Sequence, residues 1–486
     1  MNYKMILNTV GKILCLEAAL MVPAFFISLG NEEIDSMHGL AMTIVLTAAV
    51  GVLLLTLIVP KNKNFYAREG FFTVAFTWVV ISLFGALPFF FSGAIPSFVD
   101  CWFETVSGFT TTGASIIPDV LAIPKGLLYW RSFTHWLGGM GVLVFVLALQ
   151  PMARGGSGQA VHLLRAESPG PEVEKLTPRM HQTAKILYSI YIGMTLLQIL
   201  LLALGGMPLF DNICITFGSA GTGGFAVLPD SIASYSPYIQ WVVTIFMALF
   251  GVNFSIYYLF LLKKPKQALK SEELRWYVGI LLGATALIAV NTWGMHGGAA
   301  ETIRHSAFQV SSIMTTTGYA TVDFSLWPEF SRWVLMILMI VGACAGSTGG
   351  GIKVSRFVLM IKSLLAGGKK LRNPRAVALV KMDGKTVSDR TLHGLSLYMT
   401  AYVFILATSC LLVGWNGLGI ETTLSSVFAC LNNVGPGLDV AGPLSSYAGF
   451  SVLSKIVLSA GMLFGRLEIF PLLMLFSPAL WSRKHS

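Results

Sequence analysis

A short sequence rich in threonine and glycine occurs four times in this chain, each time between a half-polar stretch and a long apolar run. The copies occupy residues 110–113 (Thr-Thr-Thr-Gly), 221–224 (Gly-Thr-Gly-Gly), 315–318 (Thr-Thr-Thr-Gly) and, in a degenerate form, 432–435 (Asn-Asn-Val-Gly). The half-polar stretches are too short to cross a bilayer, which takes about 20 apolar residues. Non-helical backbone at membrane depth is tolerated only where it is buried in protein or lines a wet cavity. The repetition therefore predicts four re-entrant loops around one cavity.

The composition agrees with a membrane location. Of the 486 residues, 55% are hydrophobic and only 12% are charged, against about 25% charged residues in soluble domains. The apolar runs are long and do not alternate with period two, so they predict helical spans and not the strands of a barrel. We expect an all-α integral membrane protein.

The apolar runs follow one plan that repeats along the chain. Two N-terminal spans, at 6–29 and 40–59, come before four units, each made of a span, a half-helix, a Gly-containing loop and a second span. The expected span, half-helix and second span lie at 71–91, 100–109 and 127–149 in unit one, at 186–204, 211–220 and 239–262 in unit two, at 276–293, 301–314 and 333–365 (broken in its middle) in unit three, and at 392–413, 421–431 and 450–480 in unit four. Asp100 precedes Gly113 by the same distance at which Asp211 precedes Gly224, which supports this alignment.

The plan predicts ten full spans and four re-entrant hairpins in a pseudo-fourfold arrangement around a central pore. Its divisions are residues 1–60 (two N-terminal helices), 61–150, 151–262, 263–390 and 391–486 (pore repeats 1 to 4). Within a single chain, internal repeats of this size are common in transport proteins.

The charged residues are distributed unevenly between alternate connections. Basic residues gather in some of them, above all between Lys353 and Arg390, whereas the others carry acids such as Glu32, Asp119 and Asp323. The positive-inside rule then places the basic connections and both termini in the cytoplasm. The net charge of +10 is accounted for in this way, and we expect no nucleic-acid partner.

The four loops contain no ionisable side chain, so their backbone is the candidate ligand. Stacked rings of carbonyl oxygens can replace the hydration shell of an alkali cation, and glycine allows backbone torsions that turn carbonyls toward an axis. The expected cation-binding filter consists of Thr110, Thr111, Thr112 and Gly113; Gly221, Thr222, Gly223 and Gly224; Thr315, Thr316, Thr317 and Gly318; and Asn432, Asn433, Val434 and Gly435. The Gly-rich second copy leaves its register open by one residue.

A second Gly-rich stretch, residues 342–351, interrupts the last span of unit three. Each glycine costs a helix about 1 kcal/mol relative to alanine, so this stretch predicts either a cytoplasmic loop or a small intramembrane plug that gates the pore. The plug would consist of Gly346, Ser347, Thr348, Gly349, Gly350 and Gly351, followed by Lys353. Arg466, in the final span, is expected to face the pore, because a charge at membrane depth is costly and usually lines a cavity. Glu468 could instead neutralise it.

Other candidate sites are weak. The six cysteines are scattered without a metal-ligand spacing, and His135 beside Gly138 and Gly139 is expected to be a satisfied structural group. The stretch 154–158 lacks the lysine of a phosphate loop. We find no catalytic triad, acid pair or transition-metal cluster, and we expect no enzyme and no cofactor in this chain.

The four loops, the break at 342–351 and Arg466 together resemble the TrkH/TrkG/KtrB superfamily of potassium-transporting membrane subunits, and the two extra N-terminal spans make the chain more similar to TrkH and TrkG. The resemblance covers essentially the whole chain. It implies K⁺ uptake through backbone carbonyls, a gate at 342–351 assisted by Arg466, a homodimer, and a prokaryotic inner membrane. It also implies a TrkA-like cytosolic subunit that docks on the basic inner face and binds NAD or ATP/ADP-type ligands.

Two alternatives stay open at this point. The chain could be the membrane subunit of an ATPase-driven K⁺ pump of the KdpA kind, or a Na⁺-permeable or ion-coupled symporter. A membrane-embedded enzyme would need a buried cluster of His, Asp or Glu, which the sequence does not contain.

Overall fold

The computed structural model describes residues 2–60, 67–141, 180–375 and 377–475. Within them the chain is helical apart from its connecting loops and one two-stranded antiparallel hairpin, β1 (Lys381–Met382) and β2 (Lys385–Thr386). The prediction of an all-helical protein is confirmed.

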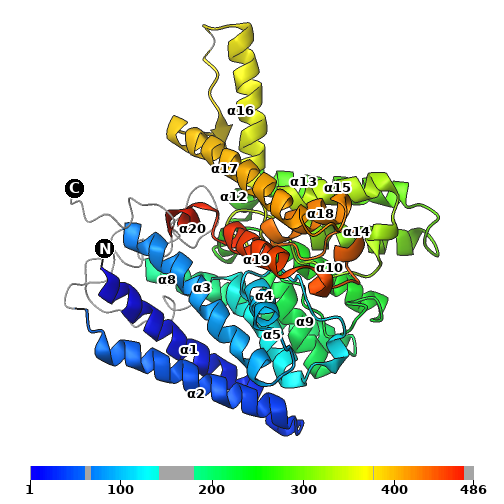
Figure 1. Ribbon diagram of the computed structural model, residues 1–486. Coiled ribbons are helices and arrows are strands. Elements are labelled where there is room, and N and C mark those ends of the chain that lie inside the picture. Colours follow the sequence, from blue (N-terminus) through cyan, green and yellow to red (C-terminus); the bar gives the residue numbers. More distant parts are fainter. Residues whose placement is uncertain (1, 61–66, 142–179, 376, 476–486) are drawn as a thin grey trace.

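Six of the described helices are long and apolar enough to cross a membrane: α1 (Tyr3–Gly30), α2 (Ile34–Leu57), α3 (Ala67–Phe91), α8 (Met180–Leu204), α13 (Glu272–Asn291) and α17 (Asp389–Gly414). They include the two N-terminal spans and the first span of every unit. The helices α1 and α2 pack along each other at one side of the molecule (Figure 1). Small residues allow this close approach, because a Cβ on Gly11 would already lie 3.0 Å from the carbonyl oxygen of Gly51.

The predicted half-helices are present. They are α4 (Phe98–Phe109), α9 (Leu209–Gly221), α14 (Ala299–Met314) and α18 (Ile420–Leu431). Each ends at one of the four Thr/Gly loops, within one residue of the expected position.

The second span of each unit differs from the prediction. A break at 342–353 separates α15 (Glu329–Val341) from α16 (Val354–Arg372), as expected. The unbroken helix expected at 239–262 is wrong: α10 (Pro237–Phe250) and α11 (Phe254–Leu261) meet at a bend of 93°, and the Asn253 side chain caps α11. The helix expected at 450–480 is also interrupted, between α19 (Val452–Arg466) and α20 (Phe470–Leu475).

Among the described residues, fewer single helices are long and apolar enough to cross a membrane than the ten spans predicted. The described residues contain six helices that could cross a membrane, or seven if the bent pair counts as one. In unit one, α5 (Lys125–Gly139) ends at a run of glycines, and the rest of the expected span at 127–149 lies outside the described residues. The short helix α12 (Pro265–Leu269) follows α11. Glycine and asparagine stand at the break after α10 and glycines at the end of α5, whereas the break after α19 passes through Glu468 and Ile469 at positive φ.

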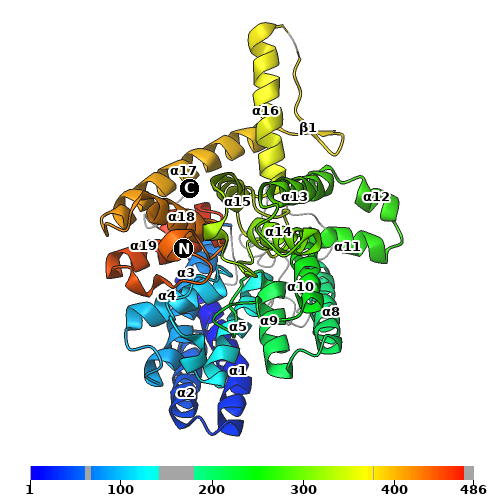
Figure 2. The ribbon, with the colours of Figure 1, turned by 90° about the vertical axis from the view of Figure 1, so that its right-hand side faces the viewer.

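The units contact one another in a closed ring. Helix α5 of unit one packs against α9 of unit two, α10 against α14, α15 against α18, and α19 of unit four returns to α4 of unit one. Figure 2 shows the corresponding groups of helices around a common middle, in chain order.

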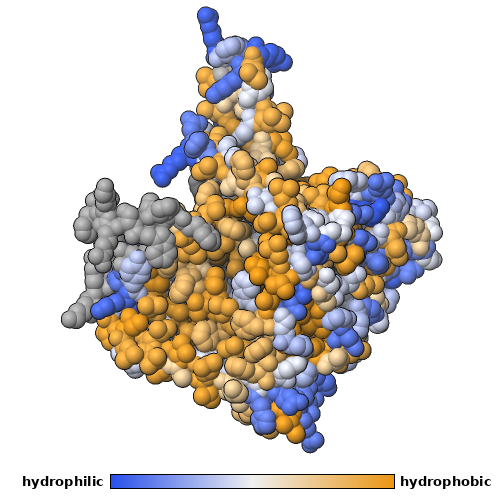
Figure 3. Space-filling view, in the orientation of Figure 1, coloured by the Kyte–Doolittle hydropathy of each residue, from blue (hydrophilic) through white to orange (hydrophobic). Residues whose placement is uncertain are grey.

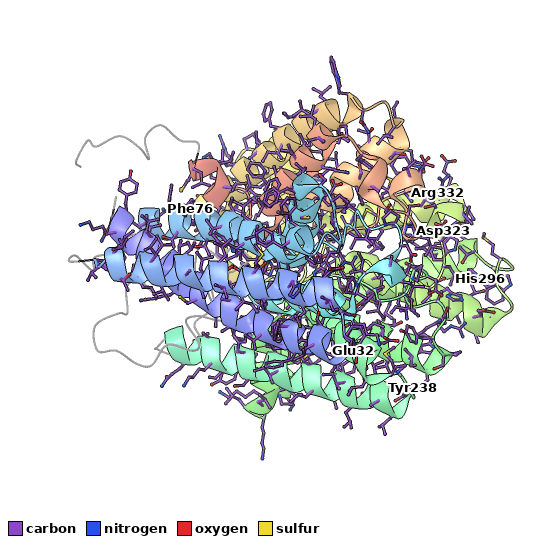
Figure 4. The ribbon with its side chains drawn as sticks, turned by 60° about the horizontal axis from the view of Figure 1, so that its bottom comes forward. Glu32, Phe76, Tyr238, His296, Asp323 and Arg332 are labelled. Carbon is purple, nitrogen blue, oxygen red and sulfur yellow. The ribbon has the colours of Figure 1, made fainter. Side chains whose placement is uncertain are left out.

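Hydrophobic and hydrophilic residues are separated on the surface. Hydrophobic residues cover the face over α1 and α2, while hydrophilic residues gather at the tip of α16 and at the ends of the molecule (Figure 3). Glu32, Tyr238, His296, Asp323 and Arg332 lie toward one end, and Phe76 lies toward the other (Figure 4). Glu32 and Asp323, acids of two different connections, thus lie toward the same end.

Candidate functional site

All four half-helices end in the same backbone motif. The second residue of each loop is left-handed, with φ of 55° at Thr111, 55° at Thr222, 58° at Thr316 and 55° at Asn433. In loop 1 (residues 110–113), the N–H of Thr111 donates to the carbonyl of Gly108 and the N–H of Thr112 donates to that of Ser107. The same pair of bonds recurs in loops 2 (221–224), 3 (315–318) and 4 (432–435). This is the Schellman motif that ends many helices, in which glycine usually takes the left-handed position. Here threonine takes that position in three loops and asparagine takes it in the fourth.

The motif uses the N–H groups of the loops and leaves carbonyls free. Among the described residues, no hydrogen bond reaches the carbonyl of the third residue in any loop: Thr112, Gly223, Thr317 and Val434. A buried carbonyl without a partner is costly. Left-handed threonine is strained by about 1–3 kcal/mol, and such strain gathers at functional sites. The four loops therefore present unpaired acceptors directly after a residue that the fold holds in the left-handed conformation.

The glycine that ends each loop brings it against the next loop. The φ angles are 82° at Gly113, 80° at Gly224, 87° at Gly318 and 95° at Gly435. A Cβ on each glycine would overlap the third carbonyl oxygen of the following loop: Gly113 meets Gly223, Gly224 meets Thr317, Gly318 meets Val434, and Gly435 returns to Thr112. We call these oxygens the third-position ring. The contacts fix the register of the second loop as Gly221, Thr222, Gly223 and Gly224.

His135 explains why the second loop is rich in glycine. Its ring fills the space that a side chain at Gly223 would need, and its backbone carbonyl does the same at Gly221. The Nδ1 atom lies 2.8 Å from the carbonyl oxygen of Gly108, and Nε2 accepts the N–H of Phe225 at 3.2 Å. Because Nε2 accepts, Nδ1 carries the proton and the imidazole is neutral. The prediction of a structural histidine is confirmed.

A cavity of about 280 Å³ opens on the glycine ends of all four loops. Arg131 lies among its lining residues, and sequence reasoning missed it. Its Nε donates to Glu104 at 2.6 Å, and its guanidinium lies 3.6 Å from the centre of the Phe225 ring. Glu104 also accepts the N–H of Ile116, three residues past Gly113, at 2.9 Å. The signal in the sequence was the pair of opposite charges on half-helix and second span of one unit.

The Gly-rich segment (residues 342–351) contacts the other end of the loops. The N–H of Gly350 donates to the hydroxyl of Thr316 at 2.6 Å, and that of Gly351 to the carbonyl of Asn432 at 3.0 Å. A Cβ on Gly349 would come within 2.9 Å of the carbonyl oxygen of Thr315. The cavity and the Gly-rich segment thus lie at opposite ends of loops 3 and 4.

Two cations predicted for this region lie beside the Gly-rich segment. Lys353 is buried and donates to the carbonyl of Gly349. Arg466 donates to the carbonyls of Thr348 at 2.9 Å and Gly139 at 2.7 Å, and lies 3.4 Å from the Thr111 hydroxyl. Arg466 therefore joins the Gly-rich segment to loop 1 and to the end of α5.

Glu468, the alternative partner considered for Arg466, forms an ion pair with another arginine. Glu468 pairs with Arg356 in the first turn of α16. Within the described part of the chain, no group of three or more His, Cys, Asp or Glu side chains could hold a metal ion.

Comparisons with known proteins agree with this geometry. Residues 36–484 match the model of the family TrkH, described as a cation transport protein. The Trk system potassium uptake proteins TrkH of Salmonella typhimurium and of Escherichia coli are each 33% identical, over 99% of this chain and 100% of their own length. The Escherichia coli protein TrkG is 32% identical over 99% of both chains. The crystal structure of the potassium transporter TrkH from Vibrio parahaemolyticus superposes with a TM-score of 0.90 at 30% identity, covering 99% of this chain and 100% of that one. The chain belongs to the TrkH family of cation transport proteins.

Proposed function

We propose that this chain takes up K⁺ across the cytoplasmic membrane through a pseudo-fourfold pore whose filter is made of backbone carbonyls. The third-position ring carries this proposal. Four unpaired carbonyls, one from each unit, are held in a closed cycle by glycines that admit no side chain. Such a ring suits a dehydrated alkali cation, and the relatives at 33% identity are named potassium uptake proteins.

The cavity and the Gly-rich segment at the two ends of the loops suggest the path of the ion. The ion enters the cavity that borders Gly113, Gly224, Gly318 and Gly435 and leaves past the Gly-rich segment. The half-helices point their C-terminal ends at the loops, and the partial negative charge there favours a cation. The pairing of Arg131 with Glu104 keeps an uncompensated positive charge away from the entrance.

We infer that the Gly-rich segment is the gate. Gly346, Ser347, Thr348, Gly349, Gly350 and Gly351 form no helix. Their contacts with Thr316 and Asn432 place them directly beneath loops 3 and 4. Lys353 and Arg466 hold carbonyls of Gly349 and Thr348, so that two positive charges stand on the exit side. A segment that makes no helical backbone bonds can rearrange without unfolding a helix.

The remaining features suit a regulated subunit of a prokaryotic inner membrane, with both termini in the cytoplasm. Helix α16 projects from the body (Figure 1) and exposes Leu364, Leu365 and Leu371, which a second copy could cover in a homodimer. Its last turn carries Lys369, Lys370 and Arg372, a basic surface that suits docking of a TrkA-like nucleotide-binding subunit. Nucleotides would bind to that partner.

The test is ⁸⁶Rb⁺ uptake into proteoliposomes that hold this chain alone, without ATP, with K⁺, Na⁺ or Li⁺ as competitor. Block by K⁺ but not by Na⁺ or Li⁺ is the expected result, and uptake without ATP excludes an obligatory pump. Equal competition by all three ions would contradict the K⁺ filter. Dependence of uptake on a proton or Na⁺ gradient would favour symport.

A further inference from the structure

Two adjacent carboxylates begin helix α13, and each holds a different part of unit three. Glu273 is only 8% exposed, and its Oε1 accepts the N–H of Ala345 at 2.8 Å and the N–H of Ser355 at 3.1 Å. Ala345 lies within the Gly-rich segment, and Ser355 is the second residue of α16. One carboxylate oxygen thus fastens the chain on both sides of Gly346 to Gly351.

The carboxylate of Glu273 supplies a helix cap for α16 that the Gly-rich segment itself does not provide. Lys353, which precedes α16, makes no side-chain bond that caps the helix, so Glu273 caps α16 from another element. Bonds from backbone N–H groups to a buried carboxylate are about twice as strong as neutral ones. Because glycine gives the segment no preferred conformation, its position depends on anchors of this kind.

Glu272 faces the hairpin that follows α16. The N–H of Glu272 donates to Asp383 Oδ1 at 2.6 Å, and the N–H of Asp383 donates back to Glu272 Oε2 at 3.3 Å. Lys362 of α16 forms an ion pair with Glu272 and donates to the carbonyl of Lys381 at 2.7 Å. The turn between β1 and β2 is therefore fixed to the same helical turn that holds the Gly-rich segment.

We propose that Glu273 is the positioning residue that keeps the Gly-rich segment beneath the filter, and that the first turn of α13 couples the β1–β2 hairpin to it. This inference rests on the proposed gate. A ligand or partner that displaces the hairpin from Glu272 would shift Glu273 and release both ends of the segment. The path of this coupling is short, because Glu272 and Glu273 are neighbours in the sequence, and the coupling requires no movement of the filter.

The experiment measures initial ⁸⁶Rb⁺ uptake into proteoliposomes by the full chain and its variants. Glu273→Ala removes two charge-assisted bonds and should raise uptake about tenfold or more. Glu273→Gln keeps an acceptor without the charge and should raise uptake about threefold. Half-saturating Rb⁺ and the K⁺/Na⁺ competition ratio should stay unchanged in both, because the filter is untouched; general loosening of the fold would alter them.

Asp383→Ala tests the coupling to the hairpin. Asp383 bonds with Glu272, and no hydrogen bond joins it to residues 342–355 within the described part of the chain. Its replacement should raise uptake by less than Glu273→Ala, and the double variant should equal Glu273→Ala alone. The matched control is Glu329→Ala, which removes an exposed carboxylate from the first turn of α15 in the same unit and should leave uptake unchanged.

The outcomes separate this inference from the proposed function. Selective uptake by the parent chain, with Glu273→Gln and Asp383→Ala equal to Glu329→Ala, would overturn the inference and leave the pore intact. These two variants decide the matter if Glu273→Ala does not fold. Additive effects of Glu273→Ala and Asp383→Ala would refute the coupling. No uptake by any variant, including one that lacks residues 346–351, would count against the proposed function itself.

Discussion

The replacement Gly113→Ala tests the third-position ring most directly, because it adds a single methyl group at the contact between two loops. At φ of 82°, an L-residue costs about 1–2 kcal/mol. The new Cβ would also overlap the carbonyl oxygen of Gly223, so that one loop must move by roughly an ångström; overpacking of this kind costs about 1–3 kcal/mol. The total of about 2–5 kcal/mol is smaller than the stability of most folded proteins. We therefore expect a folded chain with a displaced carbonyl.

The matched control is Gly206→Ala. Gly206 has φ of 79°, close to that of Gly113, but no atom lies within 4 Å of the position that its Cβ would take. It therefore carries the torsional cost alone, and the difference between the variants isolates the contact with Gly223.

The assay is ⁸⁶Rb⁺ uptake into proteoliposomes with K⁺ or Na⁺ as competitor. In Gly113→Ala the discrimination between K⁺ and Na⁺ should fall at least about tenfold, which corresponds to about 1.4 kcal/mol and is within the strain introduced. Gly206→Ala should keep the parent ratio. The reasoning is refuted if Gly113→Ala folds and keeps its discrimination, or if both variants lose it equally.

Three further replacements test other contacts. Arg466→Gln removes charge-assisted bonds to the carbonyls of Thr348 and Gly139, so basal ⁸⁶Rb⁺ uptake should rise; unchanged or lower uptake would contradict a role in closing the gate. Lys455→Met leaves the carboxylate of Asp100 without its partner at 2.7 Å and should lower the unfolding free energy by about 1–3 kcal/mol, while adding Asp100→Asn should restore most of it in thermal unfolding. The carboxyl oxygens of the buried Glu17 accept no hydrogen bond from the described residues, so Glu17→Leu should raise the midpoint of thermal unfolding by a few degrees, and a fall would reveal a partner.

Much of the fold could be predicted because local signals were strong. The first span of every unit, both N-terminal spans and the four half-helices lie within six residues of their expected bounds. Length and hydrophobicity determine such helices, since the bilayer leaves few alternatives. The second spans were harder to predict. Two breaks, at Gly251 to Asn253 and after Arg466, involve three residues each and give no compositional signal comparable to the run at 342–351.

The residues of the candidate site were likewise predicted only in part. The repeated Thr/Gly pattern located all four loops. Arg466 and Lys353 were identified as candidates because charged residues are rare in apolar segments. The repeated pattern did not reveal that the left-handed position recurs at Thr111, Thr222, Thr316 and Asn433, since threonine there runs against its own preference. Glu104, Arg131 and Glu273 were also missed, because each derives its role from partners far away in the sequence.

The sequence by itself therefore determined a helical membrane protein with four similar Thr/Gly loops and a Gly-rich break in the last span of unit three. Only the tertiary structure decided the register of the second loop, through the contacts of Gly113 with Gly223 and of Gly224 with Thr317. It also decided the closed order in which the terminal glycine of each loop meets the next loop. The physical reason is that turns and apolar length are local properties of the chain, whereas a carbonyl without a partner and a glycine without room are defined by the neighbours that the fold brings to them.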